Sequence, residues 1–210
     1  MTYKYPDVAL LVFCKAPVIG QVKTRLMPQL NAEQAVNVHI ELTERTLSLL
    51  DKAHYCPIQL WCSPYLEHPF FEKCVDNYAI SLHLQQGNDL GERMHHAINT
   101  ALESSSTVLI IGCDCPSLTS DDIEFAITAL QAENEVVIAP AEDGGYVMIG
   151  MRKAQPHLFL NMTWGHEQVF EYTHQRIKEL DLMLIKTRKQ WDVDTFDDLQ
   201  RYRCDIGVTV

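Results

Sequence analysis

The chain has 210 residues, of which 47% are hydrophobic and 21% are charged, and this composition is typical of a globular protein. A chain of this length buries enough surface to form a core without disulfides or a structural metal. Its net charge of −11 argues against an extended nucleic-acid surface but permits a small anionic ligand at a local basic cluster. The longest apolar run, residues 8–14, is too short to span a membrane and lacks the features of a signal peptide, so we expect a cytoplasmic protein.

The seven cysteines contain no C-x-x-C pair, and without an export signal we expect them to be reduced thiols. Cys113 and Cys115 are separated by one residue, but nothing nearby in the sequence supplies a matching second pair of ligands. Because a structural zinc site needs four ligands, the sequence does not favour zinc at this pair.

The first predicted element is a buried strand over residues 8–14, which a loop to residue 30 follows. Asn31 and Gln34 then form a capping-box pair at the start of a helix whose apolar residues recur at helical spacing. The next elements in chain order are strands over 58–62 and 82–85, a helix over 90–101 and a strand over 108–112.

In the second half, Thr119 and Asp122 open a helix that extends to about residue 132. Two strands, 136–140 and 146–150, flank a turn over 141–145. The last predicted elements are a helix over 167–180, a strand over 182–186 and a helix over 195–202. No linker or repeat interrupts this alternation, which predicts one α/β domain over residues 1–210, with a mostly parallel sheet between two layers of helices.

Ligands of such sheets bind beyond the carboxyl ends of the strands, and the loop after the first strand carries a basic cluster there. Lys15, Lys23 and Arg25 lie within residues 8–32, which contain no acidic residue, and Gly20 permits a sharp turn between them. Lysine and arginine bind phosphate oxygens, so we predict phosphate binding here. The alternative is a solvated loop; a Walker motif is absent.

A carboxylate, Asp114, follows the strand over 108–112 and is expected to project into the same crevice. Oxygen ligands of this kind suit Mg²⁺ or Mn²⁺, which bind one or two carboxylates together with substrate phosphates. The alternative is that Asp114 caps the next helix, although Thr119 or Ser120 is better placed for that role.

Near the C-terminus, Asp192 and Asp194 alternate and therefore share one face of an extended segment. Either residue is a candidate second metal ligand, and we select Asp194, which lies just before the last helix. Asp197 and Asp198 are expected to favour the positive end of that helix.

Two further loops provide weaker candidates. Glu142 and Asp143 precede two glycines, where a substrate has room, and are candidates for a catalytic base if the acceptor is a hydroxyl; a plain Asp-Gly hairpin explains the segment almost as well. Gly87 and Asp89 are candidates for contact with a base or ribose, and a simple helix start is the alternative.

Six segments together carry a resemblance to a known superfamily. They are FCKAP at 13–17, GQVKTRL at 20–26, GNDLGERM at 87–94, GCDCPSL at 112–118, APAEDGGY at 139–146 and DVDTFDDL at 192–199. On these segments the chain resembles the nucleotide-diphospho-sugar transferases of the GT-A type, which have a Rossmann-like three-layer sandwich. Within them it resembles a bacterial family that was long carried as a domain of unknown function and is assigned to glycosyltransferases.

The resemblance implies that Lys15, Lys23 and Arg25 bind phosphates, and that Asp114 and Asp194 hold the metal. Residues 22–26 are also similar to the phosphate loop of phospholactate guanylyltransferases. Two motifs differ: the nucleotidyltransferase loop L-x-A-G-x-G-x-R is absent, and Cys115 and Pro116 follow Asp114 where glycosyltransferases have D-x-D.

Three functions compete on these grounds. The first is transfer of a sugar from a nucleotide-sugar to a small acceptor, with metal and basic loop stabilising the departing diphosphate. The second is nucleotidyl transfer from a nucleoside triphosphate to a phosphorylated small molecule, which releases pyrophosphate and needs more positive charge. The third is a nucleotide-binding protein without turnover. The oligomeric state is not determined by the sequence.

Overall fold

The computed structural model describes residues 2–205, which form one seven-stranded sheet with the order β3-β2-β1-β4-β6-β5-β7. The strands are β1 (Val8–Lys15), β2 (Ile58–Ser63), β3 (Ile80–Leu84), β4 (Thr107–Gly112), β5 (Val136–Pro140), β6 (Tyr146–Met151) and β7 (Leu184–Lys186). Strand β6 runs antiparallel to β4 and β5, whereas the other strand pairs are parallel. The α/β class and the mostly parallel sheet are thereby confirmed.

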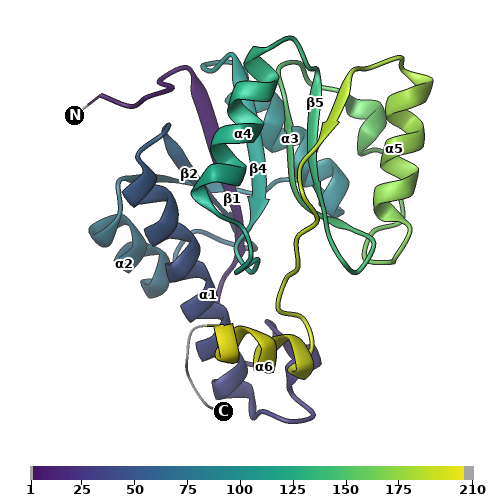
Figure 1. The fold of residues 1–210 in the computed structure, drawn as a ribbon. Helices are drawn as coiled ribbons and strands as arrows, with labels where there is room; N and C mark the ends of the chain where they lie inside the picture. The colour runs from purple at the N-terminus through teal and green to yellow at the C-terminus, as the bar shows by residue number, and fades with distance from the viewer. Residues whose placement is uncertain (1, 206–210) are drawn as a thin grey trace.

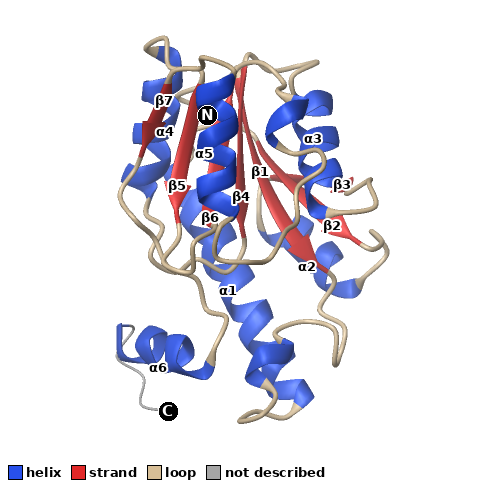
Figure 2. Cartoon of the chain, turned by 90° about the vertical axis from the view of Figure 1, so that its right-hand side faces the viewer, coloured by secondary structure: helices blue, strands red, loops and turns tan. Residues whose placement is uncertain are grey.

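Helices cover both faces of this sheet (Figures 1 and 2). They are α1 (Ala32–Ala53), α2 (Pro69–Asn77), α3 (Leu90–Ala101), α4 (Ser120–Gln131), α5 (Val169–Glu179) and α6 (Phe196–Asp205), with short 3₁₀ turns η1 (Thr24–Leu26) and η2 (Pro156–Leu158). Leu10 and Val12 of β1 share a core with α1, α2 and α4, while Ala9 and Leu11 share one with α3 and α5. The alternation of side chains along a strand therefore produces the three layers.

Helix α6 lies apart from the sheet, beside the first turns of α1 and the η1 segment (Figure 1). A third, smaller core joins these parts; its buried members are Leu26, Val38, Leu42, Trp191, Val193, Leu199 and Tyr202. This small core connects the basic loop after β1 to the C-terminal segment that carries Asp194.

The capping box predicted at Asn31 and the helix start predicted at Thr119 are confirmed, and Thr119 forms a capping box with Asp122. Helix α2 was not predicted, because its nine residues bury only Phe70, Phe71 and Cys74 and are too few for a clear period. The strand predicted over 182–186 begins only at Leu184, since the Leu182 amide donates to Ile177 and completes the end of α5. Within residues 2–205 no helix has both the length and the apolarity to cross a bilayer.

Candidate functional site

Lys23 extends from the loop after β1 into a cluster of carboxylates at the carboxyl edge of the sheet. Its ammonium lies 2.6 Å from Asp114 Oδ2 and 3.3 Å from Asp194 Oδ1, and donates to the Val193 carbonyl oxygen at 2.7 Å. The backbone of Lys23 is left-handed, with φ at +48°, and its side chain is only 6% exposed. Two predicted metal ligands and one predicted phosphate ligand therefore meet at one point.

A third carboxylate, Asp192, belongs to the same cluster. One oxygen from each of Asp114, Asp192 and Asp194 lies within 4.8 Å of the others. The Val193 amide donates to the Asp114 carbonyl oxygen at 3.0 Å, which holds the 191–194 segment against the end of β4. The alternation of Asp192 and Asp194 was the signal for a shared face, but the sequence did not predict that both residues enter the site.

The pKa values of the cluster reflect its excess of negative charge. Burial raises the pKa of Asp114, but the charge and the hydrogen bond of Lys23 outweigh burial, and the pKa lies below the ordinary carboxyl value. Burial followed by the neighbouring carboxylates raises the pKa of Asp192 to about 7. Burial lowers the pKa of Lys23, yet Asp114 and Asp194 raise it further and keep the ammonium charged. Because three carboxyl groups surround one ammonium, a further positive charge would stabilise the cluster.

The donor set fits a hard divalent cation. Mg²⁺ and Mn²⁺ take carboxylate oxygens, and Mg²⁺ usually takes one or two of them together with water and substrate phosphates. Asp114 and Asp194 are intermediate in exposure, with side chains 30% and 37% exposed, so that solvent and a ligand reach their oxygens. These carboxylates would supply ligands to such an ion at the border of a cleft.

That cleft has a volume of about 440 Å³ and is lined by the cations Lys15, Lys23, Arg25 and Arg93 together with Asp114 and Asp194. Arg25 donates to Asp194 at 2.9 Å and remains 65% exposed. Arg93 of α3 donates through Nε to the Gly87 carbonyl oxygen at 3.0 Å. Sequence reasoning missed Arg93, because only the packing of α3 on the sheet turns this helical residue toward the basic loop.

Three other predicted residues shape the loops and are not among those that line the cleft. Gly20 has φ at +78° with open space around it and forms a turn of the basic loop. Asp89 caps α3, since its Oδ1 accepts from the Glu92 amide at 2.8 Å. Gly87 has φ at +140°, and a Cβ there would lie 2.6 Å from that of Glu92. Gly87 and Asp89 therefore have the helix-start geometry that was the alternative interpretation.

A second pocket of about 200 Å³ adjoins the cleft, and Phe13, Leu90 and Gly112 line both. Its lining is largely apolar and includes Trp164, with Asp143, Tyr146 and His166 as its ionisable groups. Asp143 Oδ1 accepts from the Gly145 amide at 2.9 Å. The pocket places a carboxylate next to an aromatic surface, an arrangement that suits a small polar acceptor.

Glu142 points elsewhere. It pairs with Arg201 of α6 at 2.9 Å, is 52% exposed, and is absent from the lining of both the cleft and the adjoining pocket. The structure therefore brings Asp143 to the pocket and leaves Glu142 in an ion pair outside it.

The loop that carries Asp143 is held by a close backbone contact. Gly144 has φ at +88°, and a Cβ there would lie 1.9 Å from the Glu167 carbonyl oxygen. The Phe170 amide also donates to the Gly144 carbonyl oxygen at 2.9 Å. These contacts join the turn after β5 to the start of α5 and fix one side of the second pocket.

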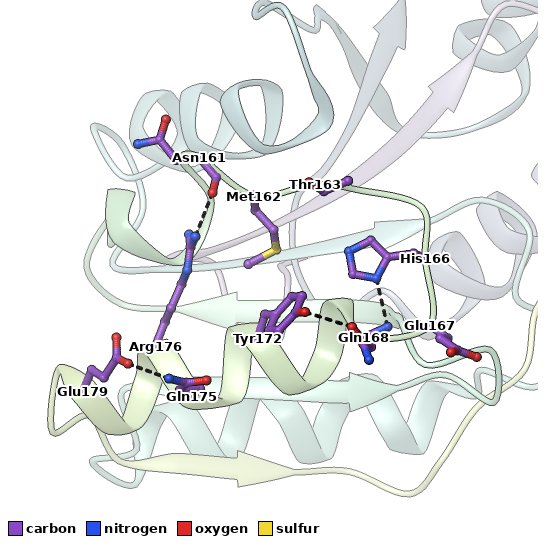
Figure 3. A pocket seen from close by; sticks show the side chains of 10 residues that line it. All are labelled: Asn161, Met162, Thr163, His166, Glu167, Gln168, Tyr172, Gln175, Arg176 and Glu179. Atoms are coloured by element: carbon purple, nitrogen blue, oxygen red, sulfur yellow. Dashed lines mark hydrogen bonds between the residues drawn. The ribbon is translucent and has the colours of Figure 1, made fainter.

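A separate groove of about 690 Å³ runs along α5 (Figure 3). Its arginine, Arg176, already donates to the carbonyl oxygens of His157, Leu160 and Asn161. Two further pairs on α5, Gln168 with Tyr172 and Gln175 with Glu179, are also hydrogen-bonded (Figure 3). The groove lacks the combination of free cations and clustered carboxylates that distinguishes the cleft.

The described chain has the fold of nucleotide-diphospho-sugar transferases. A protein provisionally assigned as such a transferase, from Desulfovibrio desulfuricans G20, is 28% identical, with a TM-score of 0.84 over 95% of this chain and 88% of that chain. A 4-diphosphocytidyl-2C-methyl-D-erythritol synthase from Anaerococcus prevotii DSM 20548 shares the fold at 10% identity and a TM-score of 0.67, over 96% and 99%. So does Rv0371c of Mycobacterium tuberculosis H37Rv, solved with manganese, at 13% identity and 0.56, over 93% and 97%.

No curated protein matches the sequence. A family of bacterial proteins does match: the model described as "uncharacterized protein conserved in bacteria (DUF2064)" covers residues 46–166, which is more than half of the chain. The matched range contains Asp114 and Asp143, whereas the basic loop and the segment with Asp194 lie on either side of it. The chain therefore belongs to the DUF2064 family.

Proposed function

We propose that this protein is a metal-dependent transferase that moves a sugar from a nucleotide-sugar to a small acceptor. The observation that carries the proposal is the convergence of Asp114, Asp192 and Asp194 with cationic side chains on one cleft at the carboxyl edge of the sheet. Ligands of open α/β sheets bind at this edge. The fold, which the chain shares with a provisionally assigned nucleotide-diphospho-sugar transferase, supports the same class of reaction.

Each part of the cleft has a role in this proposal. Lys15, Arg25 and Arg93 bind the donor diphosphate, on which negative charge develops as the sugar leaves. Asp114 and Asp194, with Asp192 beside them, hold Mg²⁺ or Mn²⁺, which supplies further positive charge to that diphosphate. Lys23 holds the carboxylates in position through its contacts with Asp114 and Asp194.

The adjoining pocket takes the acceptor in this proposal. Asp143 is the candidate base for the acceptor hydroxyl, since it lines the pocket that shares Phe13, Leu90 and Gly112 with the cleft. Trp164 offers an apolar surface for a sugar ring or another small acceptor. A base must lie within hydrogen-bond reach of the proton it removes, and Asp143 borders the space in which the acceptor is proposed to bind.

A second candidate is nucleotidyl transfer from a nucleoside triphosphate. It is favoured by the fourth cation of the cleft, Arg93, which adds to Lys15, Lys23 and Arg25 the charge that a triphosphate requires. The two functions differ in the released product, which is a nucleoside diphosphate in the first and pyrophosphate in the second.

The test is a set of thermal melts with nucleotide-sugars and nucleoside triphosphates, each with and without Mn²⁺, followed by product analysis. A ligand at a hundred times its Kd stabilises by about 2.7 kcal/mol, which is roughly 5–10 °C for a chain of this length. We expect a metal-dependent shift with a nucleotide-sugar and release of nucleoside diphosphate. A shift with triphosphates alone, with pyrophosphate release, supports the second function.

Asp114→Asn is the matching variant, and it is expected to lose the metal-dependent shift. Asp76→Asn on the exposed side of α2 is its control, because Asp76 is not among the residues that line the cleft. If no nucleotide of either class shifts the melt of the wild-type protein, the proposed function is wrong. If Asp114→Asn keeps the shift, the assignment of Asp114 as metal ligand is wrong.

A further inference from the structure

Two cysteines and a histidine meet below the floor of the cleft. Cys14 lies near the end of β1, Cys113 directly follows β4, and His39 projects from α1; all three are buried. Phe13 of β1 is paired with Gly112 of β4 in the parallel register. The residues that follow them, Cys14 and Cys113, are therefore neighbours at the ends of these two strands. The sulfur atoms and one ring nitrogen of His39 all lie within 4.8 Å of one another.

We propose that Cys14, His39 and Cys113 bind a soft transition-metal ion of the zinc class. The distance from Cys14 Sγ to His39 Nε2 is 3.6 Å. Zinc lies about 2.3 Å from sulfur and about 2.0–2.1 Å from nitrogen, so two such ligands at a tetrahedral angle are roughly 3.5 Å apart. Thiolate and imidazole ligands select zinc-like ions, whereas the carboxylates of the adjacent cluster select Mg²⁺ or Mn²⁺.

This set differs from the Cys113-x-Cys115 pair that the sequence suggested and then disfavoured. Cys115 Sγ contacts Ser117 Oγ at 3.4 Å and is not part of the three-ligand group. The partners of Cys113 are instead Cys14 of β1 and His39 of α1, and these two residues lie 74 or more positions earlier in the chain. Only the sheet order and the packing of α1 bring them together.

In the metal-free arrangement two of the ligand atoms are hydrogen-bonded to the same backbone oxygen, and a metal ion would replace these bonds. The Lys15 carbonyl oxygen accepts from His39 Nε2 at 2.9 Å and from Cys14 Sγ at 3.3 Å. Thr46 of α1 donates to the Cys113 carbonyl oxygen at 3.3 Å and ties the helix to the loop after β4. Metal binding converts the two thiols to thiolates and releases up to two protons, and it requires the His39 proton to reside on Nδ1.

A fourth ligand would come from the side of the cleft. Cys14, His39 and Cys113 all line the 440 Å³ cavity, although each is nearly inaccessible to solvent. A site with three protein ligands and one open position accepts water or a donor atom of a bound molecule. A soft ion at this position therefore lies directly below the space that the cationic side chains border.

The test uses Co²⁺ as a spectroscopic probe of the full-length, metal-free protein kept under reducing conditions. We expect one equivalent of Co²⁺ to produce visible absorption of tetrahedral strength and a near-ultraviolet thiolate-to-cobalt charge-transfer band, and we expect Zn²⁺ to abolish both. Excess Mg²⁺ leaves the bands in place. We expect the charge-transfer band to be lost or reduced in three variants, Cys14→Ala, Cys113→Ala and His39→Gln. Near-ultraviolet circular dichroism establishes that each variant is folded.

Cys56→Ala is the matched control, since Cys56 is equally buried but outside the cluster, and it keeps the bands. Asp114→Asn also keeps them, because it removes an oxygen ligand of the neighbouring cluster only. Absence of a charge-transfer band in the folded wild-type protein overturns the proposal, and so does its retention in a folded Cys14→Ala, Cys113→Ala double variant. The readout is independent of nucleotide turnover, so its failure leaves the proposed function standing.

Discussion

Lys23 is the residue on which the electrostatics of the cleft depend. Its side chain is buried, while its partners Asp114 and Asp194 are partly open to solvent. An ammonium in this position holds mutually repelling carboxylates together before any ligand arrives. The hydrogen bonds of Lys23 to Asp114 and to the Val193 carbonyl oxygen also fix the position of this cation, although the loop that carries it is long.

Replacement of Lys23 by Met is expected to destabilise the protein by about 1–3 kcal/mol, less than loss of a partner from a fully buried pair because Asp114 and Asp194 are partly solvated. Mn²⁺ is expected to recover part of this loss, since it supplies positive charge to the same carboxylates. Urea unfolding with and without Mn²⁺ measures both effects. Lys73→Met removes an exposed pair with Glu44 and is the control, with a much smaller change in unfolding free energy. If Lys23→Met loses as much unfolding free energy with Mn²⁺ as without it, this role of Lys23 is wrong.

The two candidate bases are separable by activity. Asp143→Asn is expected to lower turnover about 10²–10⁴-fold, the range of general base catalysis, because Asp143 lines the pocket proposed to take the acceptor. Glu142→Gln is expected to have a much smaller effect, since Glu142 pairs with Arg201 outside that pocket. Steady-state rates at saturating donor make the comparison. The opposite order of effects makes Glu142 the base and contradicts the assignment of Asp143.

At the level of elements, the site depends on loops that are held by contacts with neighbouring secondary structure. The turn after β5 meets the start of α5 at Gly144, and the segment after β7 meets the start of α4 at Arg188. Such contacts decide where a loop side chain points, and so they determine which acidic residues reach the cleft.

Gly144→Ala and Gly20→Ala form a matched pair, since both glycines have φ near +80°. A Cβ at position 20 meets no atom within 4 Å, so the cost is that of a left-handed residue, about 1–2 kcal/mol. At position 144 the Cβ would overlap the Glu167 carbonyl, and the loop must move. We expect the larger loss of stability and of acceptor binding in Gly144→Ala, measured by thermal melts and by KM. Equal losses in the two variants argue against a constraining contact at Glu167.

Asp122 is expected to make the free energy of unfolding depend on pH in the acidic range. Burial raises its pKa, but hydrogen bonds from Arg188 and Thr119 outweigh burial and lower it below the ordinary value. A carboxyl whose folded pKa is depressed stabilises the fold above the unfolded pKa of about 3.9, and the stabilisation is lost as pH falls through the folded pKa. Asp122→Asn is expected to cost about 1–3 kcal/mol at pH 7.

Urea unfolding across pH 7 to pH 3 tests this expectation. The difference in unfolding free energy between wild type and Asp122→Asn narrows as pH falls below about 4, because protonated Asp122 no longer carries the charge that binds Arg188. Asp121→Asn is the control, because Asp121 is exposed and is not the carboxylate that pairs with Arg188. A difference that stays constant with pH excludes the charge of Asp122 as its source.

For the whole molecule, the cleft is bordered by segments from both ends of the chain. The basic loop after β1 and the segment with Asp194 meet in the small core beneath α6, which includes Leu26, Val193 and Leu199. Arg203 and Tyr202 of α6 also donate to Glu41 of α1. Through these contacts α6 acts as a clamp on the basic loop that borders the cleft.

Leu199→Ala tests this clamp. It removes a side chain that is 3% exposed, and we expect a loss of stability of about 2–5 kcal/mol together with weaker donor binding. The reason for weaker binding is greater freedom of Lys23 and Arg25, which hydrogen exchange over residues 22–30 reports. Phe125→Ala, at a side chain that is 48% exposed, is the control and changes neither. Unchanged exchange over 22–30 in Leu199→Ala contradicts the clamp.

Local patterns in the sequence determined most of the elements and the edge of the sheet at which the site lies. Capping boxes at Asn31 and Thr119 and the buried run of β1 depend on neighbouring residues, and these predictions were confirmed. The spacing of carboxylates after strands also placed Asp114 and Asp194 at one edge, because parallel strands present their carboxyl ends together.

Tertiary structure alone decided which side chains meet. Asp192 and Arg93 belong to the site, and Glu142 pairs with Arg201 outside it. The third example is the cluster of Cys14, His39 and Cys113. Each of these arrangements joins positions that are far apart in the chain. Such contacts depend on strand order, helix packing and loop-to-helix hydrogen bonds, none of which leaves a periodic trace in the sequence. The chain's local preferences therefore determine the edge at which the site forms, and long-range packing selects its members.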